Sequence, residues 1–295
     1  MAAASLLRGV NPQHVIMFHH FREILARAHE RGIDAAPLKG AHLITRVYPS
    51  DEDRGFLADV DFLVRPSDWE ATLQLLADMG YMRRTIDKRP VSDREFHEAG
   101  YSLRVASGQY ITFEPHRYLV QRERLPLDYN TLWRRSVPSD FDGVPCRRLT
   151  DDDHFLHAVV HLTSHLFVIP QRHLRDMTLL LTRGDADLSR ILPETRRWHI
   201  VRAAWLALVL LRDVAPEQVS EAQIQTLAPP SAVQRYLRWL VPDRGGFRFP
   251  KMGLRAREAL LWPALFDTPG MFAAFAGSYA KLRCRDAIAR LSNIP

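Results

Sequence analysis

Apolar residues follow two distinct spacings in the first third of the chain. Over residues 12–31 they recur every three or four positions, which predicts a helix that ends at Gly32. A second helix is expected over residues 41–48, and the polar stretch 49–55 is typical of a loop. Apolar and acidic residues then alternate over residues 57–64 (LADVDFLV), and this period of two predicts a β-strand.

The pattern after this strand separates the chain into two parts. A helix is expected over residues 69–79, and two strands over residues 102–105 and 110–113. From residue 150 on, the spacing is helical, with helices expected over residues 150–168, 174–182, 198–213, 233–240 and 253–266. The sequence therefore predicts a domain of helices and strands over residues 1–149 and an all-helical domain over residues 150–295.

Composition and apolar runs exclude several classes of protein. Of the 295 residues, 46% are hydrophobic and 25% are charged, which is typical of a globular protein with a packed core. The most apolar run, residues 203–211, lies between Arg202 and Arg212 and is too short for a membrane span. We therefore expect a cytoplasmic protein with no membrane partner. The two cysteines, Cys146 and Cys284, exclude a disulfide framework and a paired-cysteine zinc site.

The basic character of the chain favours an anionic partner. The formal net charge is +6 and the isoelectric point is about 9.6. A nucleoside triphosphate, a phosphorylated acceptor or RNA would suit this charge. An arginine-rich composition can also give a basic surface without a specific partner, so charge alone does not select a function.

Two aspartates on the alternating strand are the strongest chemical feature. Asp59 and Asp61 are two positions apart, so their side chains are expected on the same face of the strand. Adjacent carboxylates repel each other and lose hydration when they are buried, and a divalent cation such as Mg²⁺ is the simplest compensation. Glu114, at the end of the strand expected over residues 110–113, could supply a third carboxylate. The alternative is that both aspartates lie on the solvent face of an edge strand.

An ordered series of short motifs surrounds these acids. Leu38-Lys39-Gly40 is followed by Tyr48, Arg54, the Asp59-to-Val64 strand and Met79-Gly80-Tyr81. This series resembles the nucleotidyltransferase superfamily with the DNA polymerase β-like fold. It is most similar to the bacterial "uncharacterised nucleotidyltransferase" family, whose acidic-x-His segment resembles residues 113–117 (FEPHR). The resemblance covers residues 12–182.

The resemblance implies a fold, a reaction and a set of site residues. It implies an α+β fold, with a small mixed sheet and flanking helices, before the all-helical domain. It also implies that Mg²⁺ or Mn²⁺ and a nucleoside triphosphate such as ATP are bound, that a nucleoside monophosphate is transferred, and that pyrophosphate is released. The implied catalytic residues and metal ligands are Asp59, Asp61 and Glu114. The implied nucleotide-binding residues are Lys39, Gly40, Arg54 and His116.

Two positions depart from the superfamily pattern. The usual Gly-Ser or Gly-Gly pair is replaced by Gly40-Ala41, so no hydroxyl follows the glycine to contact a phosphate. Glu114 is followed by Pro115, which lacks a backbone N–H and suits a strand edge or a strand end. His116 could bind nucleotide, orient Glu114, act as a base toward the acceptor, or fill a polar position in the core.

Several alternatives remain open at this level. A small molecule or a peptide is the preferred acceptor, and a tRNA or other RNA acceptor, as in a toxin, is the alternative. A nucleotide-binding relative without catalytic activity is another class. Four histidines share one face of the helix expected over residues 150–168, namely His154, His157, His161 and His165. This face could hold a second metal ion, as in a phosphohydrolase, but four histidines over three turns favour a packed helix instead.

Overall fold

The computed structural model describes residues 12–84, 97–106, 108–120, 125, 127–167, 170–242, 247–249 and 251–292. The chain divides into two compact units. The first unit comprises residues 1–121 and 129–150, and the second comprises residues 122–128 and 151–295.

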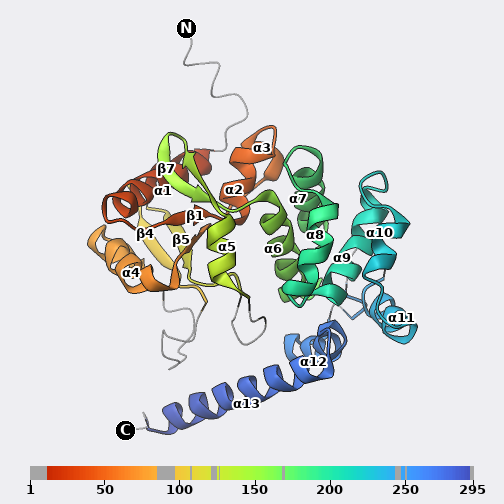
Figure 1. Cartoon of the computed structure of the whole chain (residues 1–295). Coiled ribbons are helices and arrows are strands. Elements are labelled where there is room, and N and C mark those ends of the chain that lie inside the picture. The colour runs from red at the N-terminus through yellow and green to blue at the C-terminus, as the bar shows by residue number, and fades with distance from the viewer. Residues whose placement is uncertain are drawn as a thin grey trace. The chain divides into compact units, whose positions relative to one another are not determined.

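The first unit contains a five-stranded sheet, a separate hairpin and flanking helices (Figure 1). In chain order its elements are α1 (Pro12–Glu30), β1 (Ala35–Pro37), α2 (Lys39–Arg46), α3 (Asp51–Arg54), β2 (Val60–Val64), the 3-10 turn η1 (Pro66–Asp68), α4 (Trp69–Asp78), β3 (Met82–Arg83), β4 (Tyr101–Arg104), β5 (Tyr110–His116), α5 (Tyr129–Arg135), β6 (Val137–Phe141) and β7 (Val144–Arg148). The strand order is β1-β2-β5-β4-β3. β2 and β5 are parallel, and the other neighbouring pairs are antiparallel. The predicted α+β class with a small mixed sheet is confirmed.

One face of this sheet is apolar because strand residues alternate between the two faces. Helices α1 and α4 pack on that face, and their apolar side chains join those of the strands in one core. Phe21 of α1 is fully buried there, and its ring centroid lies 5.5 Å from that of Phe62 and 4.9 Å from that of Phe141. The opposite face carries the polar members of the alternation, including Asp61 and Glu114, and this face positions the candidate site.

The structure corrects three details of the first unit. The strand predicted over residues 57–64 begins only at Val60. Val60 is the first residue of this segment that pairs with β5, and pairing with β1 begins only at Phe62. Asp59 therefore lies just before the strand. The predicted loop 49–55 contains the short helix α3. The β6–β7 hairpin was not predicted, although its turn is Asp142-Gly143, both with positive φ, which is a strong hairpin signal.

The described residues of the second unit form helices joined by loops, with no strand among them. Its helices are α6 (Asp151–Ser164), α7 (Pro170–Thr182), α8 (Leu188–Arg197), α9 (Val201–Val214), α10 (Glu221–Thr226), α11 (Ser231–Leu240), α12 (Leu254–Leu265) and α13 (Pro269–Ser292). All five predicted helices of this region are present, with shifted ends. The helices α8, α10 and α13 were not predicted, and Pro193 lies inside α8.

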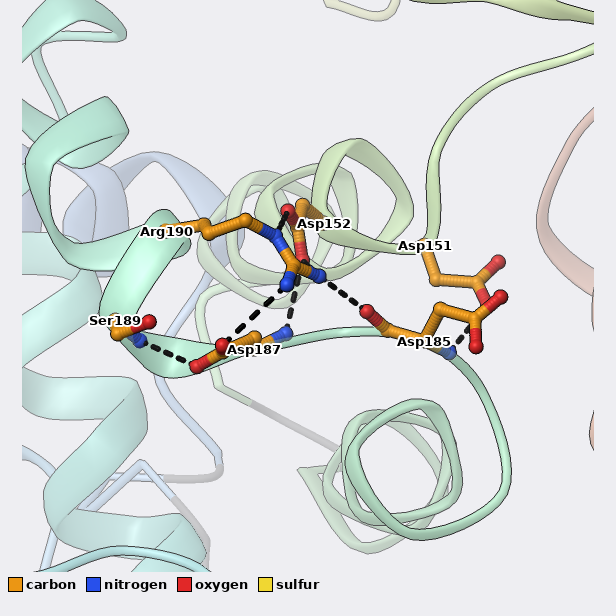
Figure 2. A network of polar contacts seen from close by, with 6 residues as sticks. All are labelled: Asp151, Asp152, Asp185, Asp187, Ser189 and Arg190. Carbon is orange, nitrogen blue, oxygen red and sulfur yellow. Dashed lines mark hydrogen bonds and ion pairs between the residues drawn. The ribbon is translucent and has the colours of Figure 1, made fainter.

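A network of aspartates and one arginine joins the starts of α6 and α8 (Figure 2). Asp151 accepts a hydrogen bond from the backbone N–H of Asp185 at 2.7 Å, and Asp152 accepts one from that of Asp187 at 2.9 Å. The Arg190 guanidinium donates to both oxygens of Asp152, at 2.6 and 3.1 Å. These acids therefore bind the loop before α8 as well as placing negative charge in the first turn of α6.

Among the described helices, none combines the length and the apolar character that crossing a bilayer requires.

Replacing Phe21 by alanine should destabilise the first unit by about 3–5 kcal/mol, because the change removes a fully buried ring and leaves a cavity. Urea unfolding followed by circular dichroism measures this loss. The matched control is Phe56→Ala, since Phe56 is 60% exposed and its loss should shift the unfolding midpoint little. Equal effects of the two substitutions would contradict the packing described above.

Candidate active site

The acidic residues meet where β2 and β5 run side by side. Asp61 and Glu114 are direct partners in the parallel register of these strands, so their side chains share one face of the sheet. Asp59 precedes β2, is partly exposed, and interacts electrostatically with Asp61. His116 is two residues beyond Glu114 on the same strand and is 1% exposed. The structure therefore brings together Asp59, Asp61, Glu114 and His116.

Asp61 is the most enclosed of the acids, at 4% exposed, and two cationic or polar groups contact it. The Lys39 Nζ lies 2.6 Å from Asp61 Oδ1, and the His116 Nε2 lies 2.8 Å from the same oxygen. Both contacts are to Oδ1, and neither uses Oδ2. Oδ2 is therefore the oxygen of Asp61 that these two partners leave for a further ligand.

Two further residues at the site, His97 and Glu98, were missed by the sequence analysis. Glu98 forms an isolated antiparallel bridge with His116, and its Oε2 lies 3.5 Å from His116 Nε2. His97 Nε2 lies 3.2 Å from the same Glu98 oxygen. The only sequence signal was a His-Glu pair shortly before β4, and this pattern is too common to indicate a site.

The Lys39 ammonium and the carboxylates of Asp61 and Glu98 stabilise one another's charged forms. Burial raises the pKa of Asp61, but the Lys39 ammonium and the hydrogen bond from His116 outweigh this, so the pKa lies well below its usual range. Burial lowers the pKa of Lys39, but the charges of Asp61 and Glu98 raise it above its ordinary value. Burial also raises the pKa of Glu98, whereas its interactions with His97 and His116 bring it down to about 2.

The remaining acids lack sufficient positive charge. Burial, followed by the charges of Asp61 and Asp59, raises the pKa of Glu114 to about 7. Burial and the neighbouring Asp61 raise the pKa of Asp59 as well. A carboxyl group with uncompensated negative charge nearby usually responds by keeping its proton to a higher pH. Binding of a divalent cation is the second way to compensate the charge. The donor set of Asp59, Asp61 and Glu114 consists of carboxylate oxygens, which fits Mg²⁺ or Mn²⁺.

Lys39 reaches Asp61 from an unusual backbone conformation. It is the first residue of α2 and has a φ of 44°, in the left-handed region that lysine rarely adopts. The preceding residue, Leu38, donates its backbone N–H to the Asp61 carbonyl at 2.9 Å. The start of α2 is thus hydrogen-bonded to the backbone of Asp61, the same residue whose side chain contacts Lys39.

Gly40 and Arg54 lie next to each other beside this helix start. A Cβ on Gly40 would overlap Leu57 Cδ2 and lie 3.0 Å from Arg54 Nη1. The glycine therefore makes room for the side chains of Leu57 and Arg54. The Arg54 guanidinium also lies 5.9 Å from the ring centroid of Tyr48. This packing holds Arg54 close to the Lys39-Gly40 turn.

Two groups of potential metal ligands share His116. In the first, the ligand atoms of Asp61, Glu114 and His116 lie within 4.8 Å of one another. In the second, the same holds for His97, Glu98 and His116. The first group is rich in oxygen, and the second contains two imidazoles. Their chemistry therefore favours different cations.

The histidine face in the second unit has a different geometry. His154 and His157 are buried in α6, as expected for a packed helix. The His161 Nε2 lies 2.7 Å from His165 Nε2, and its Nδ1 lies 3.1 Å from the Nε2 of His173 in α7. Because His161 presents a different ring nitrogen to each neighbour, these two contacts do not converge on one point.

A family model described as "uncharacterised nucleotidyltransferase" matches residues 5–216, more than half of the chain. No curated protein matches.

Three of the solved structures that resemble this chain do so weakly. One is an antigenic nucleotidyltransferase-like protein from Paracoccidioides brasiliensis, with 14% identity, a TM-score of 0.43, and coverage of 73% of this chain and 95% of that one. Another is the solution structure of the antibiotic-resistance factor ANT(2'')-Ia, with 13% identity, a TM-score of 0.38, and coverage of 63% and 89%. The crystal structure of ANT(2'')-Ia with adenylyl-2''-tobramycin has 13% identity, a TM-score of 0.35, and coverage of 56% and 87%.

Replacing Lys39 by methionine should destabilise the metal-free protein by up to about 3–5 kcal/mol, because it removes the cationic partner of the buried Asp61 carboxylate. The double substitution Lys39→Met/Asp61→Asn should lose less, since no uncompensated charge then remains. Urea unfolding of both variants and of Asp61→Asn in the presence of EDTA completes the double-mutant cycle. Additive losses would show that the pair does not stabilise the fold.

The raised pKa of Glu114 predicts a specific pH dependence of stability. The folded protein keeps this proton up to about pH 7, whereas the unfolded chain releases it near the ordinary value of 4.5. The stabilisation from this group is therefore present at acidic pH and is lost as the pH rises toward 7. From about pH 5 to about pH 8 in EDTA, the melting temperature of Glu114→Gln should rise relative to wild type.

The control for this measurement is Glu70→Gln, which removes an exposed glutamate from the same unit. Its melting temperature should follow that of wild type across the same pH range. A Glu114→Gln variant that also follows wild type would contradict the raised pKa.

Proposed function

Because the chain belongs to the uncharacterised nucleotidyltransferase family, we propose that its carboxylate cluster transfers a nucleoside monophosphate from a nucleoside triphosphate to an acceptor. The observation that carries this proposal is the register of β2 against β5. That register places Asp61 beside Glu114, with Asp59 one residue before the strand. Sites that transfer phosphoryl groups need closely spaced carboxylates of this kind to hold divalent cations.

The proposed reaction is a displacement at the α-phosphorus. An acceptor oxygen forms a bond to this phosphorus, the bond to the oxygen that bridges to the β-phosphate breaks, and pyrophosphate leaves. When bound by Asp59, Asp61 and Glu114, Mg²⁺ or Mn²⁺ would neutralise the triphosphate and stabilise the leaving group. As an alternative to binding the ion, Glu114 is proposed to take the acceptor proton on a carboxylate oxygen.

The basic residues of the site are proposed to bind the phosphates. The Lys39 ammonium contacts Asp61 at 2.6 Å. A cation at Asp61 would take over this compensation, and Lys39 could then contact a phosphate oxygen. Arg54, beside Gly40, could bind phosphate through two nitrogens at once. His116 is proposed to orient Asp61 through its 2.8 Å contact rather than to bind the nucleotide directly.

The proposed acceptor is a hydroxyl or phosphate group of a small molecule or a peptide. We also propose that residues 1–149 form the catalytic domain and that the helical residues 150–295 select this acceptor. An RNA acceptor is the alternative that the net charge of +6 would suit. Binding of tRNA that weakens steeply with salt would favour RNA over a small acceptor.

Calorimetric titration with each nucleoside triphosphate and Mg²⁺ is the direct test of the proposed function. Wild type should bind at least one triphosphate, and Asp59→Asn/Asp61→Asn should bind it at least about tenfold more weakly, because two of the three carboxylates proposed to hold the cation are altered. The matched control is Asp34→Asn/Asp78→Asn, which removes two exposed aspartates from the same unit. Its affinity should equal that of wild type.

Wild type that binds no triphosphate with Mg²⁺ or Mn²⁺ would overturn the proposal. Binding without release of pyrophosphate across a set of hydroxyl and phosphate acceptors would favour a nucleotide-binding relative that lacks catalytic activity.

A further inference from the structure

We propose that His97, Glu98 and His116 form a second cation site, which binds a transition-metal ion such as Zn²⁺ and is distinct from the carboxylate site for Mg²⁺. Two imidazoles and one carboxylate form a common set of three protein ligands for zinc, with a fourth position left for water or substrate. The proposal concerns metal binding alone and does not depend on the nucleotidyltransferase reaction.

The distances between the ligand atoms fit one ion. Zinc bonds to nitrogen and oxygen are about 2.0–2.1 Å, so two ligands on a tetrahedral ion are roughly 3.3 Å apart. His97 Nε2 and His116 Nε2 lie 3.2 and 3.5 Å from Glu98 Oε2, on either side of this value. All three ligand atoms lie within 4.8 Å of one another. Small side-chain adjustments would therefore bring them around a common centre.

The backbone holds these ligands in place before any ion arrives. Glu98 forms a bridge with His116, and Ala99 donates its N–H to the Pro115 carbonyl at 3.1 Å. Arg117 donates its N–H to the His97 carbonyl at 2.9 Å. The segment around Glu98 thus runs antiparallel to the end of β5, which reduces the ordering that metal binding would otherwise require.

The burial of the ligands gives both rigidity and access. The His116 side chain is 1% exposed, whereas the side chains of His97 and Glu98 are 21% and 37% exposed. An ion could therefore enter from the side of His97 and Glu98 and meet a fixed imidazole. The two nitrogen ligands should select Zn²⁺ over Mg²⁺, because Mg²⁺ prefers oxygen ligands and retains its water.

The second site would use a nitrogen atom that contacts the carboxylate site. The His116 Nε2 lies 2.8 Å from Asp61 Oδ1 and 3.5 Å from Glu98 Oε2. This nitrogen cannot donate a hydrogen to Asp61 while its lone pair binds a metal ion. Occupation of the second site would therefore replace the histidine hydrogen bond to Asp61 by the positive charge of the nearby ion, which would compensate that carboxylate together with Lys39.

The test is a Zn²⁺ titration of the full-length protein after removal of metals with EDTA, followed by calorimetry without nucleotide. Wild type should bind one more equivalent of Zn²⁺ than His97→Ala, or bind that equivalent at least about tenfold more tightly, because a direct ligand is lost. Glu98→Gln should show the same loss. The matched control is His20→Ala, since the His20 side chain is 22% exposed and lies in the same unit. It should bind Zn²⁺ as wild type does.

Two features keep the result interpretable. Histidines of α6 and α7 that also bind Zn²⁺ add equally to every variant, so the difference from wild type reports the proposed site. Circular dichroism identifies a variant that fails to fold. If His97→Ala fails to fold, the nearly isosteric Glu98→Gln tests the proposed site in its place. Equal stoichiometry and affinity in wild type, His97→Ala and Glu98→Gln would falsify the proposal, whatever the outcome of the triphosphate titration.

Discussion

The charge of Asp61 is held within the sheet, and the neighbouring site residues are arranged around that charge. A buried carboxylate is costly unless cationic and hydrogen-bonding groups contact it closely. Lys39 from the start of α2 and His116 from β5 meet this need at a single oxygen, Oδ1. This compensation does not extend to Glu114, directly opposite on β5, which has a pKa of about 7. The cluster thus combines two ionised acids, Asp61 and Glu98, with one that titrates near neutrality.

Much of this core could be predicted from the sequence. Alternation over the Asp59-to-Val64 segment indicated a strand with one apolar face, and that face packs on α1 and α4. The resemblance of short motifs supplied Lys39 and supported Glu114, which its place at the end of a predicted strand had already suggested. The proximity of Glu114 to Asp61 depends on a parallel pairing between strands about fifty residues apart in the chain. No local pattern specifies such a pairing, so family resemblance was needed.

The parts that were missed share a physical cause. Glu98 and His97 reach the site through a single bridge to β5, and one bridge has no periodicity to detect. The role of Gly40 depends on the side chains of Leu57 and Arg54, which approach it from later in the chain. The start of β2 at Val60 depends on the partners available in β1 and β5. Each of these features is a property of tertiary contacts.

The strained backbone of Lys39 has a consequence for how relatives of this chain would change over time. A left-handed conformation favours glycine or asparagine, so lysine is retained there only while its ammonium is useful. Once Asp61 is replaced by a neutral residue, that reason disappears, and drift toward glycine at position 39 becomes favourable. The two positions should therefore vary together. A homologue with neither residue would be one in which selection for the ion pair has ended.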